Sequence, residues 1–218
     1  PLLFHAQGHR FRVAGLLAGK VFLAFFKHVC MNPFCQLLKS SLGKKYLMAL
    51  SGFVLAGFVL SHMAGNVQIF LSPEHINAYG HKLQSLPGVA LWGIRLFLLF
   101  CVGAHIWMAV VLTVENRLAR PDRYEKEATV EATLSSRAMP YTGVFLLFFI
   151  VFHLFHFTVR NIYDYSNLPF NLHGETVHDI YAMMYLGFSH WQVSIFYIAA
   201  MSLLCPHLSH GVSSMFQT

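Results

Sequence analysis

The sequence predicts an all-α, polytopic transmembrane helical bundle with four spans, preceded by an interfacial helix. Of its 218 residues, 56% are hydrophobic and 11% are charged, whereas soluble domains carry about 25% charged residues. The mean hydropathy is +0.54. The net charge of +6 comes from basic residues that flank the apolar stretches, where the positive-inside rule accounts for them. We therefore expect a lipid bilayer as a partner and no nucleic acid.

The N-terminal 38 residues are expected to form an extension, followed by a transmembrane domain over residues 39–218. Residues 13–26 are apolar but are interrupted by Lys20 and followed by Lys27. At about 14 residues this stretch is short for a span, which needs about 20 residues. The pattern is typical of an amphipathic helix lying in the membrane interface.

Four longer apolar stretches follow, and each is predicted to be a membrane-spanning helix. They cover residues 46–71, 89–114, 139–159 and 191–210. The second begins after the Leu86-Pro87-Gly88 break, and a basic segment separates the second from the third. The polar segment 160–190 is predicted to contain a short helix at 177–185. Lysine and arginine distribution places the N-terminus and the loop between the second and third spans in the cytoplasm.

Histidines occur inside all four spans, where an ionisable side chain is costly unless it has a partner. At 1.5 Å per residue, His62 and His153 lie roughly 24 Å and 21 Å from the cytoplasmic ends of their spans. His105 and His207 each lie roughly 24 Å from the outer ends. The four histidines thus form an outer pair, His62 and His153, and an inner pair, His105 and His207. Because haem iron accepts axial histidines, each pair is predicted to bind one six-coordinate haem for electron transfer.

Further polar residues lie at the levels of these pairs. His156 and His210 each follow a pair member by three residues, on the same helix face. They are assigned to haem-edge, propionate or quinone contacts, with helix packing equally open. Lys45 and Arg137 lie at the level of the inner pair, as propionate partners or as ordinary positive-inside anchors. The candidate quinone contacts near the outer face, which could also be interfacial residues, are Asn66, Gln68, His81, His156 and Trp191.

Five separated segments occur in an order typical of one protein family. They are GKKYLMALSGFVLAGFVLSHMAGNVQIF, INAYGHKLQSLP, AHIWMAVVLTVENRLARP, FHLFHF and HLSHGVSSMFQT. From about residue 34 to its end, the chain resembles the cytochrome b membrane-anchor subunit of succinate dehydrogenase/fumarate reductase, in the dihaem b558-type branch. The family's four ligands match His62, His105, His153 and His207, paired first with third and second with fourth. The family normally has a fifth span after the FQT segment, which carries no ligand.

The resemblance implies a set of cofactors, partners and a location. The cofactors would be two haem b groups and a membrane quinone, menaquinone or ubiquinone. The partners would be a flavoprotein subunit and an iron–sulfur subunit on the cytoplasmic side, with a homo-oligomer of the complex as a further option. The chain would act as a subunit of the enzyme succinate:quinone oxidoreductase, with dicarboxylate chemistry on other chains. It would be a multi-pass protein of a bacterial inner membrane with a cytoplasmic N-terminus.

Three other functions remain open from the sequence. The first is the dihaem cytochrome b subunit of a hydrogenase or formate dehydrogenase. The second is a histidine-box di-iron membrane oxidase, suggested by the spacing of His153 with His156 and of His207 with His210. The third is a structural anchor with vestigial histidines.

Overall fold

The computed structural model describes residues 40–119 and 134–216. Residues from 47 onward form one unit, and the arrangement below concerns that unit. The predicted N-terminal extension and its interfacial helix at 13–26 lie outside the described residues. Most of the basic segment between the second and third spans also lies outside them.

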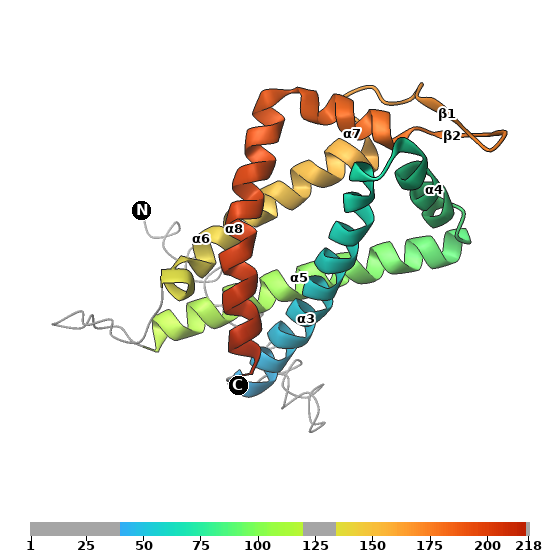
Figure 1. Ribbon diagram of the computed structural model, residues 1–218. Helices are drawn as coiled ribbons and strands as arrows, with labels where there is room; N and C mark the ends of the chain where they lie inside the picture. The colour runs from blue at the N-terminus through green and yellow to red at the C-terminus, as the bar shows by residue number, and fades with distance from the viewer. Residues whose placement is uncertain (1–39, 120–133, 217–218) are drawn as a thin grey trace, which may run out of the picture. The chain divides into compact units, whose positions relative to one another are not determined.

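Long apolar helices dominate the described chain, which confirms the prediction of an all-α transmembrane bundle (Figure 1). These helices are α3 (Ser41–Asn66), continued by the 3₁₀-helix η1 (Val67–Phe70); α5 (Gly88–Leu118); α6 (Leu134–His153), continued by the π-helix η2 (Leu154–Val159); and α8 (Trp191–Met215). Within the described residues, four helices of 25 to 31 residues are long and apolar enough to cross a membrane. The predicted spans coincide with them.

Each helix extends beyond the apolar stretch that predicted it. Starting α6 at Leu134 rather than at residue 139, for example, adds the polar residues Ser135, Ser136 and Arg137. Helical hydrogen bonding satisfies every backbone group within the segment, so the helix continues until polar side chains or solvent can take over that role. Pro140 and Pro206 lie inside α6 and α8, as membrane helices tolerate.

The spanning helices pack unevenly against one another. Among the described spans, α6 and α8 make the most extensive contact, with Phe149 on α6 packing against Phe196 and Tyr197 on α8 at ring-centroid distances of 5.8 Å and 4.9 Å. Large apolar side chains remain exposed on the other helices, including Phe53 (66%) and Phe100 (71%). Apolar surface on this scale matches a lipid environment rather than water.

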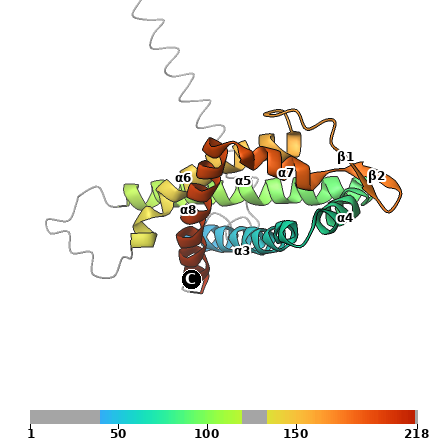
Figure 2. The same cartoon turned by 45° about the horizontal axis from the view of Figure 1, so that its top comes forward.

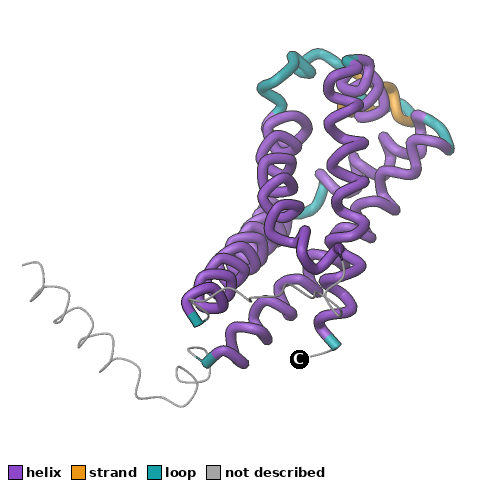
Figure 3. The backbone as a smooth tube through the Cα atoms, turned by 90° about the vertical axis from the view of Figure 1, so that its left-hand side faces the viewer, coloured by secondary structure: helices purple, strands orange, loops and turns teal. Residues whose placement is uncertain are grey.

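A small cap connects the spans at one end of this unit. It consists of α4 (Pro73–Gln84), a hairpin of β1 (Pro169–Leu172) and β2 (Glu175–His178), and α7 (Ile180–Ser189). These four elements lie together in Figures 1 and 2. The hairpin supplies the strands in the otherwise helical chain drawn in Figure 3.

Asn77 joins the two helices of the cap. Its side chain is fully buried, and its Oδ1 accepts from the backbone N–H groups of Ile180 (2.7 Å) and Tyr181 (3.1 Å). Its Nδ2 donates to Asp179 Oδ1 at 2.9 Å. The first N–H groups of a helix have no partner within the helix. Asn77 on α4 therefore caps α7 from a distance of about one hundred residues in sequence.

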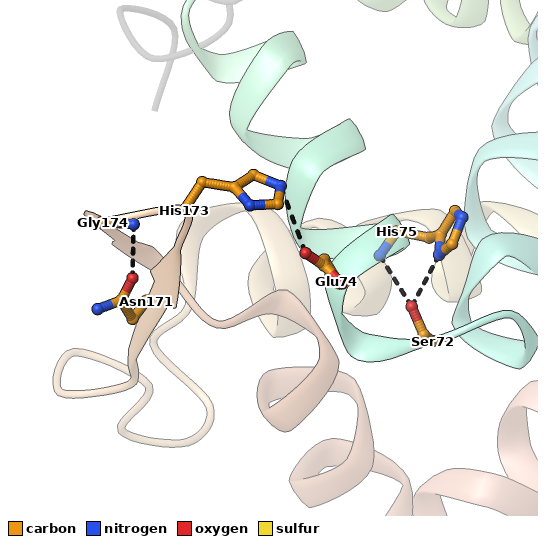
Figure 4. A network of polar contacts seen from close by, with 6 residues as sticks. All are labelled: Ser72, Glu74, His75, Asn171, His173 and Gly174. Carbon is orange, nitrogen blue, oxygen red and sulfur yellow. Dashed lines mark hydrogen bonds and ion pairs between the residues drawn. The ribbon is translucent and has the colours of Figure 1, made fainter.

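The hairpin turn contacts α4 through an ion pair. His173 and Gly174 have positive φ values of 53° and 94°, as a two-residue type I′ turn requires. Asn171 Oδ1 accepts from the Gly174 N–H at 2.8 Å, and His173 Nε2 lies 3.3 Å from Glu74 Oε1 on α4 (Figure 4). The loop is thereby held against the cap helix.

The sequence prediction was less accurate in the cap than in the spans. The predicted helix at 177–185 begins only at Ile180, because Val177 pairs in β2 and the Asp179 side chain caps the helix by accepting from Ala182 N–H at 2.9 Å. Helix α4 was not predicted. Its start signals were present: Ser72 accepts from His75 N–H at 3.2 Å (Figure 4), and Pro73 occupies the first turn.

Candidate functional site

The structure brings the four span histidines together as the two predicted pairs. The ring centroids of His62 on α3 and His153 on α6 lie 5.7 Å apart. Those of His105 on α5 and His207 on α8 lie 6.5 Å apart. A metal-bound imidazole nitrogen lies about 2 Å from its metal, so two axial imidazoles of one metal have ring centroids roughly 6 Å apart. Both separations match this value.

The inner histidine of α5 is oriented by α3. His105 Nδ1 lies 3.3 Å from the Met48 carbonyl oxygen and 3.4 Å from Ser51 Oγ. The Ser51 hydroxyl itself donates to the Leu47 carbonyl at 2.7 Å. With the serine proton engaged there, both oxygens are acceptors, so His105 Nδ1 must carry the proton. The lone pair is then on Nε2, the atom available to a metal.

His207 is oriented in the same way by α6. Its Nδ1 lies 3.0 Å from Thr142 Oγ1. The Thr142 hydroxyl is directed to the carbonyls of Ala138 (3.2 Å) and Met139 (3.1 Å) in its own helix. When the Thr142 proton is directed to these carbonyls, the threonine oxygen accepts from His207 Nδ1–H and Nε2 holds the lone pair. Metal-binding histidines usually make this type of second hydrogen bond.

Glycines allow these histidines to approach the neighbouring helix. A Cβ atom placed on Gly52 of α3 would lie 3.2 Å from His105 Cε1, a tight contact. One placed on Gly143 of α6 would lie 3.6 Å from His207 Cε1. The small residues that the sequence places in the first half of α3 thus accommodate a candidate ligand.

The outer pair has a more aromatic environment. His153 Nδ1 lies 3.1 Å from the Tyr197 hydroxyl on α8, and its ring stacks on Phe149 at 5.8 Å. His62 stacks on Phe58 of its own helix at 5.3 Å. Three of the four candidate ligands therefore have Nδ1 hydrogen bonded to an adjacent helix, with Nε2 directed elsewhere.

His156 occupies a different kind of position from the paired histidines. It is fully buried, and its ring stacks on Phe157 at 3.9 Å. Its Nδ1 lies 3.1 Å from the Tyr197 hydroxyl, and its Nε2 lies 2.9 Å from the Tyr165 hydroxyl. Because tyrosines occupy both ring nitrogens, the geometry favours the helix-packing role that the sequence left open.

The remaining sequence candidates lie around the two pairs. Asn66 ends α3 and donates from Nδ2 to the His62 carbonyl at 2.9 Å. His81 on α4 lies 3.6 Å from Glu175 in the hairpin, through Nε2 and Oε2.

His210 lies one turn beyond His207 on α8, and Arg137 is exposed in the first turn of α6. Lys45 is exposed in the first turns of α3.

Two buried side-chain nitrogens near the cap, on Arg160 after η2 and on His178 in β2, have no hydrogen-bond partner within the described residues. They are Nε of Arg160, which ends the π-helix with a φ of 63°, and Nε2 of His178. Burial and the nearby positive charge of Arg95 lower the pKa of Arg160. Burial, and then the charge of Arg160, lower the pKa of His178, although Asp179 opposes this shift. This region is thus locally electropositive.

The sequence prediction missed the residues that orient the histidines. They are Ser51, Thr142, Tyr165 and Tyr197. The available signal was their polarity, since hydroxyl groups inside apolar spans need partners. Spacing could not identify Ser51, Thr142 and Tyr197 as histidine partners, because each acts on a helix distant in sequence, whereas Tyr165 lies in the loop that follows the helix of His156.

The donor set fits a pair of bis-histidine haem sites. Neutral imidazoles with defined tautomers meet at a separation suited to one iron, between helices that are otherwise sparsely packed. Within the described residues, no three histidine, cysteine, aspartate or glutamate side chains gather around a single metal position. No protein-family model matches the chain, and neither the curated proteins nor the solved structures give a significant match.

Proposed function

We propose that this chain is the membrane-anchor, dihaem b cytochrome subunit of a succinate:quinone oxidoreductase. It would pass electrons between an iron–sulfur subunit on the cytoplasmic side and a quinone in the membrane. The proposal rests on the ring-centroid distances between His62 and His153 and between His105 and His207. Both distances suit two imidazoles bound to one iron. The histidine pairs by themselves suggest a dihaem protein. The five segments that resemble the family suggest that it belongs to this class of complex.

The chain's own residues account for the binding of the cofactor. Haem b, when bound, supplies a reversible one-electron couple. His62 and His153 would hold one group, and His105 and His207 the other, each through Nε2. Ser51, Thr142 and Tyr197 hold the Nδ1 protons and so fix the ring orientations. Because two histidines would hold each group, the chemistry that it would supply is electron transfer.

The quinone would bind near the outer pair, on the side of the cap. Asn66 and His81 are the candidate contacts, because η1 and α4 bring them to the end of α3 that carries His62. His156 could contact a quinone only after losing one of its tyrosine hydrogen bonds. Asn66 and His81 are therefore the first residues to test.

Charge distribution supports the proposed orientation and partners. Arg117 ends α5 and Arg137 begins α6, so both lie at the end of the spans opposite the cap. The cap end carries Lys82, Arg95 and Arg160, whereas the sequence between α5 and α6 adds Arg120, Arg123 and Lys126 to Arg117 and Arg137. By the positive-inside rule, which counts lysine and arginine, the cap would face outward in a bacterial inner membrane. The flavoprotein and iron–sulfur subunits would bind at the opposite, cytoplasmic face, and the complex could further associate as a homo-oligomer.

The histidine geometry bears differently on two rival functions. A hydrogenase or formate dehydrogenase cytochrome b would use the same two haem sites, so only the identity of its soluble partner subunits would distinguish it. A histidine-box di-iron oxidase would need His153 and His156 to share one metal centre. The tyrosines on both nitrogens of His156 count against this.

The test is to purify the chain with its native partners from membranes. We expect flavoprotein and iron–sulfur subunits to co-purify, a b-type signal from two haems in the reduced-minus-oxidised spectrum, and succinate-dependent quinone reduction. Co-purification of hydrogenase or formate dehydrogenase subunits would identify the first rival. A preparation without any b-type signal would overturn the proposal and support a structural anchor.

A further inference from the structure

We propose that Tyr197, with His156 and Tyr165 behind it, is a positioning residue that sets the redox potential of the outer haem. The inference rests on the proposed function, because it concerns the haem that His62 and His153 would hold. It assigns a further role to a hydrogen-bonded chain that extends beyond the residues that would hold the haem.

The chain has four members and runs from the outer pair toward the cap. The Tyr197 hydroxyl lies 3.1 Å from Nδ1 of both His153 and His156. His156 Nε2 then lies 2.9 Å from the Tyr165 hydroxyl. His156 is fully buried and Tyr165 is 2% exposed, whereas Tyr197 and His153 are half-buried. The chain links α6, the π-helix, α8 and the loop before the hairpin.

The protons in this chain have one consistent arrangement once His153 binds iron through Nε2. His153 Nδ1 then carries a proton and donates it to the Tyr197 oxygen. The Tyr197 hydroxyl proton is free to point at His156 Nδ1, which must accept. His156 Nε2 therefore carries the proton and donates to the Tyr165 oxygen. Every ring nitrogen is satisfied, as buried polar groups require.

The two histidines that share the hydroxyl lie at the junction of α6 and the π-helix. Residues three apart in a helix lie on the same side, and His153 is the last residue of α6 while His156 lies in η2. Their Nδ1 atoms reach one oxygen at the same distance. Single turns of π-helix are frequent at functional sites. Gly187 leaves room for the arrangement, since a Cβ there would lie 2.9 Å from His156 Nε2.

The inner pair lacks such an extension within the described residues. Ser51 and Thr142 accept from His105 and His207, but their own protons return to carbonyls of the same helix. Among the described contacts, the outer pair is therefore the one coupled through side chains to the cap.

A hydrogen-bond acceptor on Nδ1 raises the basicity of a metal-bound histidine and so favours the more highly charged, oxidised iron. Tyr197 should lower the potential of the outer haem.

The experiment measures haem potentials by optical redox titration of the purified full-length complex. Each variant is made in the wild-type chain and also with His105→Ala, so that the outer haem can be observed alone. We expect Tyr197→Phe to raise the outer potential by about 59 mV, the equivalent of a tenfold change for a one-electron couple. Thr142→Val is the matched control: it removes the Nδ1 acceptor of His207 and should shift only the inner haem.

Tyr165→Phe provides a second variant that leaves the direct contact with His153 intact. It should raise the potential of the outer haem by a smaller amount than Tyr197→Phe does. If Tyr197→Phe loses the outer haem, Tyr165→Phe still measures the effect of the hydrogen-bonded chain on the potential. An outer potential unchanged in both tyrosine variants, or shifted equally by Thr142→Val, would overturn the inference while leaving the dihaem function in place. A wild-type preparation without haem would overturn both.

Discussion

At the residue scale, the chemistry depends on which nitrogen of each histidine is free. When the hydroxyls of Ser51 and Thr142 donate to carbonyls of their own helices, their oxygens accept from His105 and His207. The lone pair of each histidine is then on Nε2. Two ordinary polar residues thus orient the rings of the inner pair.

His207→Ala should remove the inner haem and leave much of the outer one, because the two pairs share no ligand. Haem content measured by the reduced-minus-oxidised spectrum should fall by about half. His210→Ala, one turn further along α8, is the matched control and should retain both haems. Retention of both haems in His207→Ala would contradict the pairing.

Gly52→Val should weaken the inner haem site. The added side chain would meet His105, whose Cε1 lies 3.2 Å from the position that a Cβ of residue 52 would occupy, and overpacking of this kind costs about 1–3 kcal/mol. We expect roughly a tenfold loss of haem affinity, measured by titrating haem into membranes. Gly93→Val is the control, since a Cβ there meets no atom within 4 Å. Equal effects of the two substitutions would show that helix propensity, rather than the contact with His105, is responsible.

At the element scale, the cap depends on Asn77. Its side chain satisfies two N–H groups at the start of α7 and bonds to the residue that caps that helix. Each buried group left without a partner costs about 1–3 kcal/mol. The single amide therefore joins α4 to the start of α7.

Asn77→Ala should loosen the cap without removing the spans. We expect a loss of about 3 kcal/mol in local stability, seen as faster proteolysis between residues 160 and 190 in membrane vesicles of the correct orientation. Asn171→Ala removes one exposed hydrogen bond in the hairpin turn and should change the rate little. Equal protease resistance of Asn77→Ala and the wild type would refute the role of this residue.

At the scale of the whole molecule, apolar helices with extensive exposed side chains leave lipid as the surrounding medium. In the proposed orientation, the basic loop between α5 and α6 lies in the cytoplasm and the cap lies outside. A cysteine introduced at Asn171 should react with a membrane-impermeant thiol reagent in intact cells. One introduced at Arg137 should react only after permeabilisation. The unsubstituted chain gives the baseline, and the reverse labelling pattern would invert the proposed topology.

The spans and the histidine pairs could be predicted from the sequence because both depend on local properties. An apolar stretch of sufficient length becomes a membrane helix, and a constant rise per residue converts position into depth. The pairs of His62 with His153 and of His105 with His207 follow from depth and connectivity. The rotation of each helix about its own axis cannot be predicted from depth and connectivity. The residues that contact each Nδ1 atom could therefore not be predicted from the sequence.

The surroundings of those histidines depend on how distant segments pack. Tyr197 on α8 reaches both His153 and His156, and Asn77 reaches α7, across long sequence separations. A four-span bundle with two levels of paired imidazoles was already specified by the order of the residues, because hydrophobic length and helical rise act locally. Which nitrogen is free, and how the outer pair connects to the cap, follows from packing between helices, because those contacts join side chains that are remote along the chain.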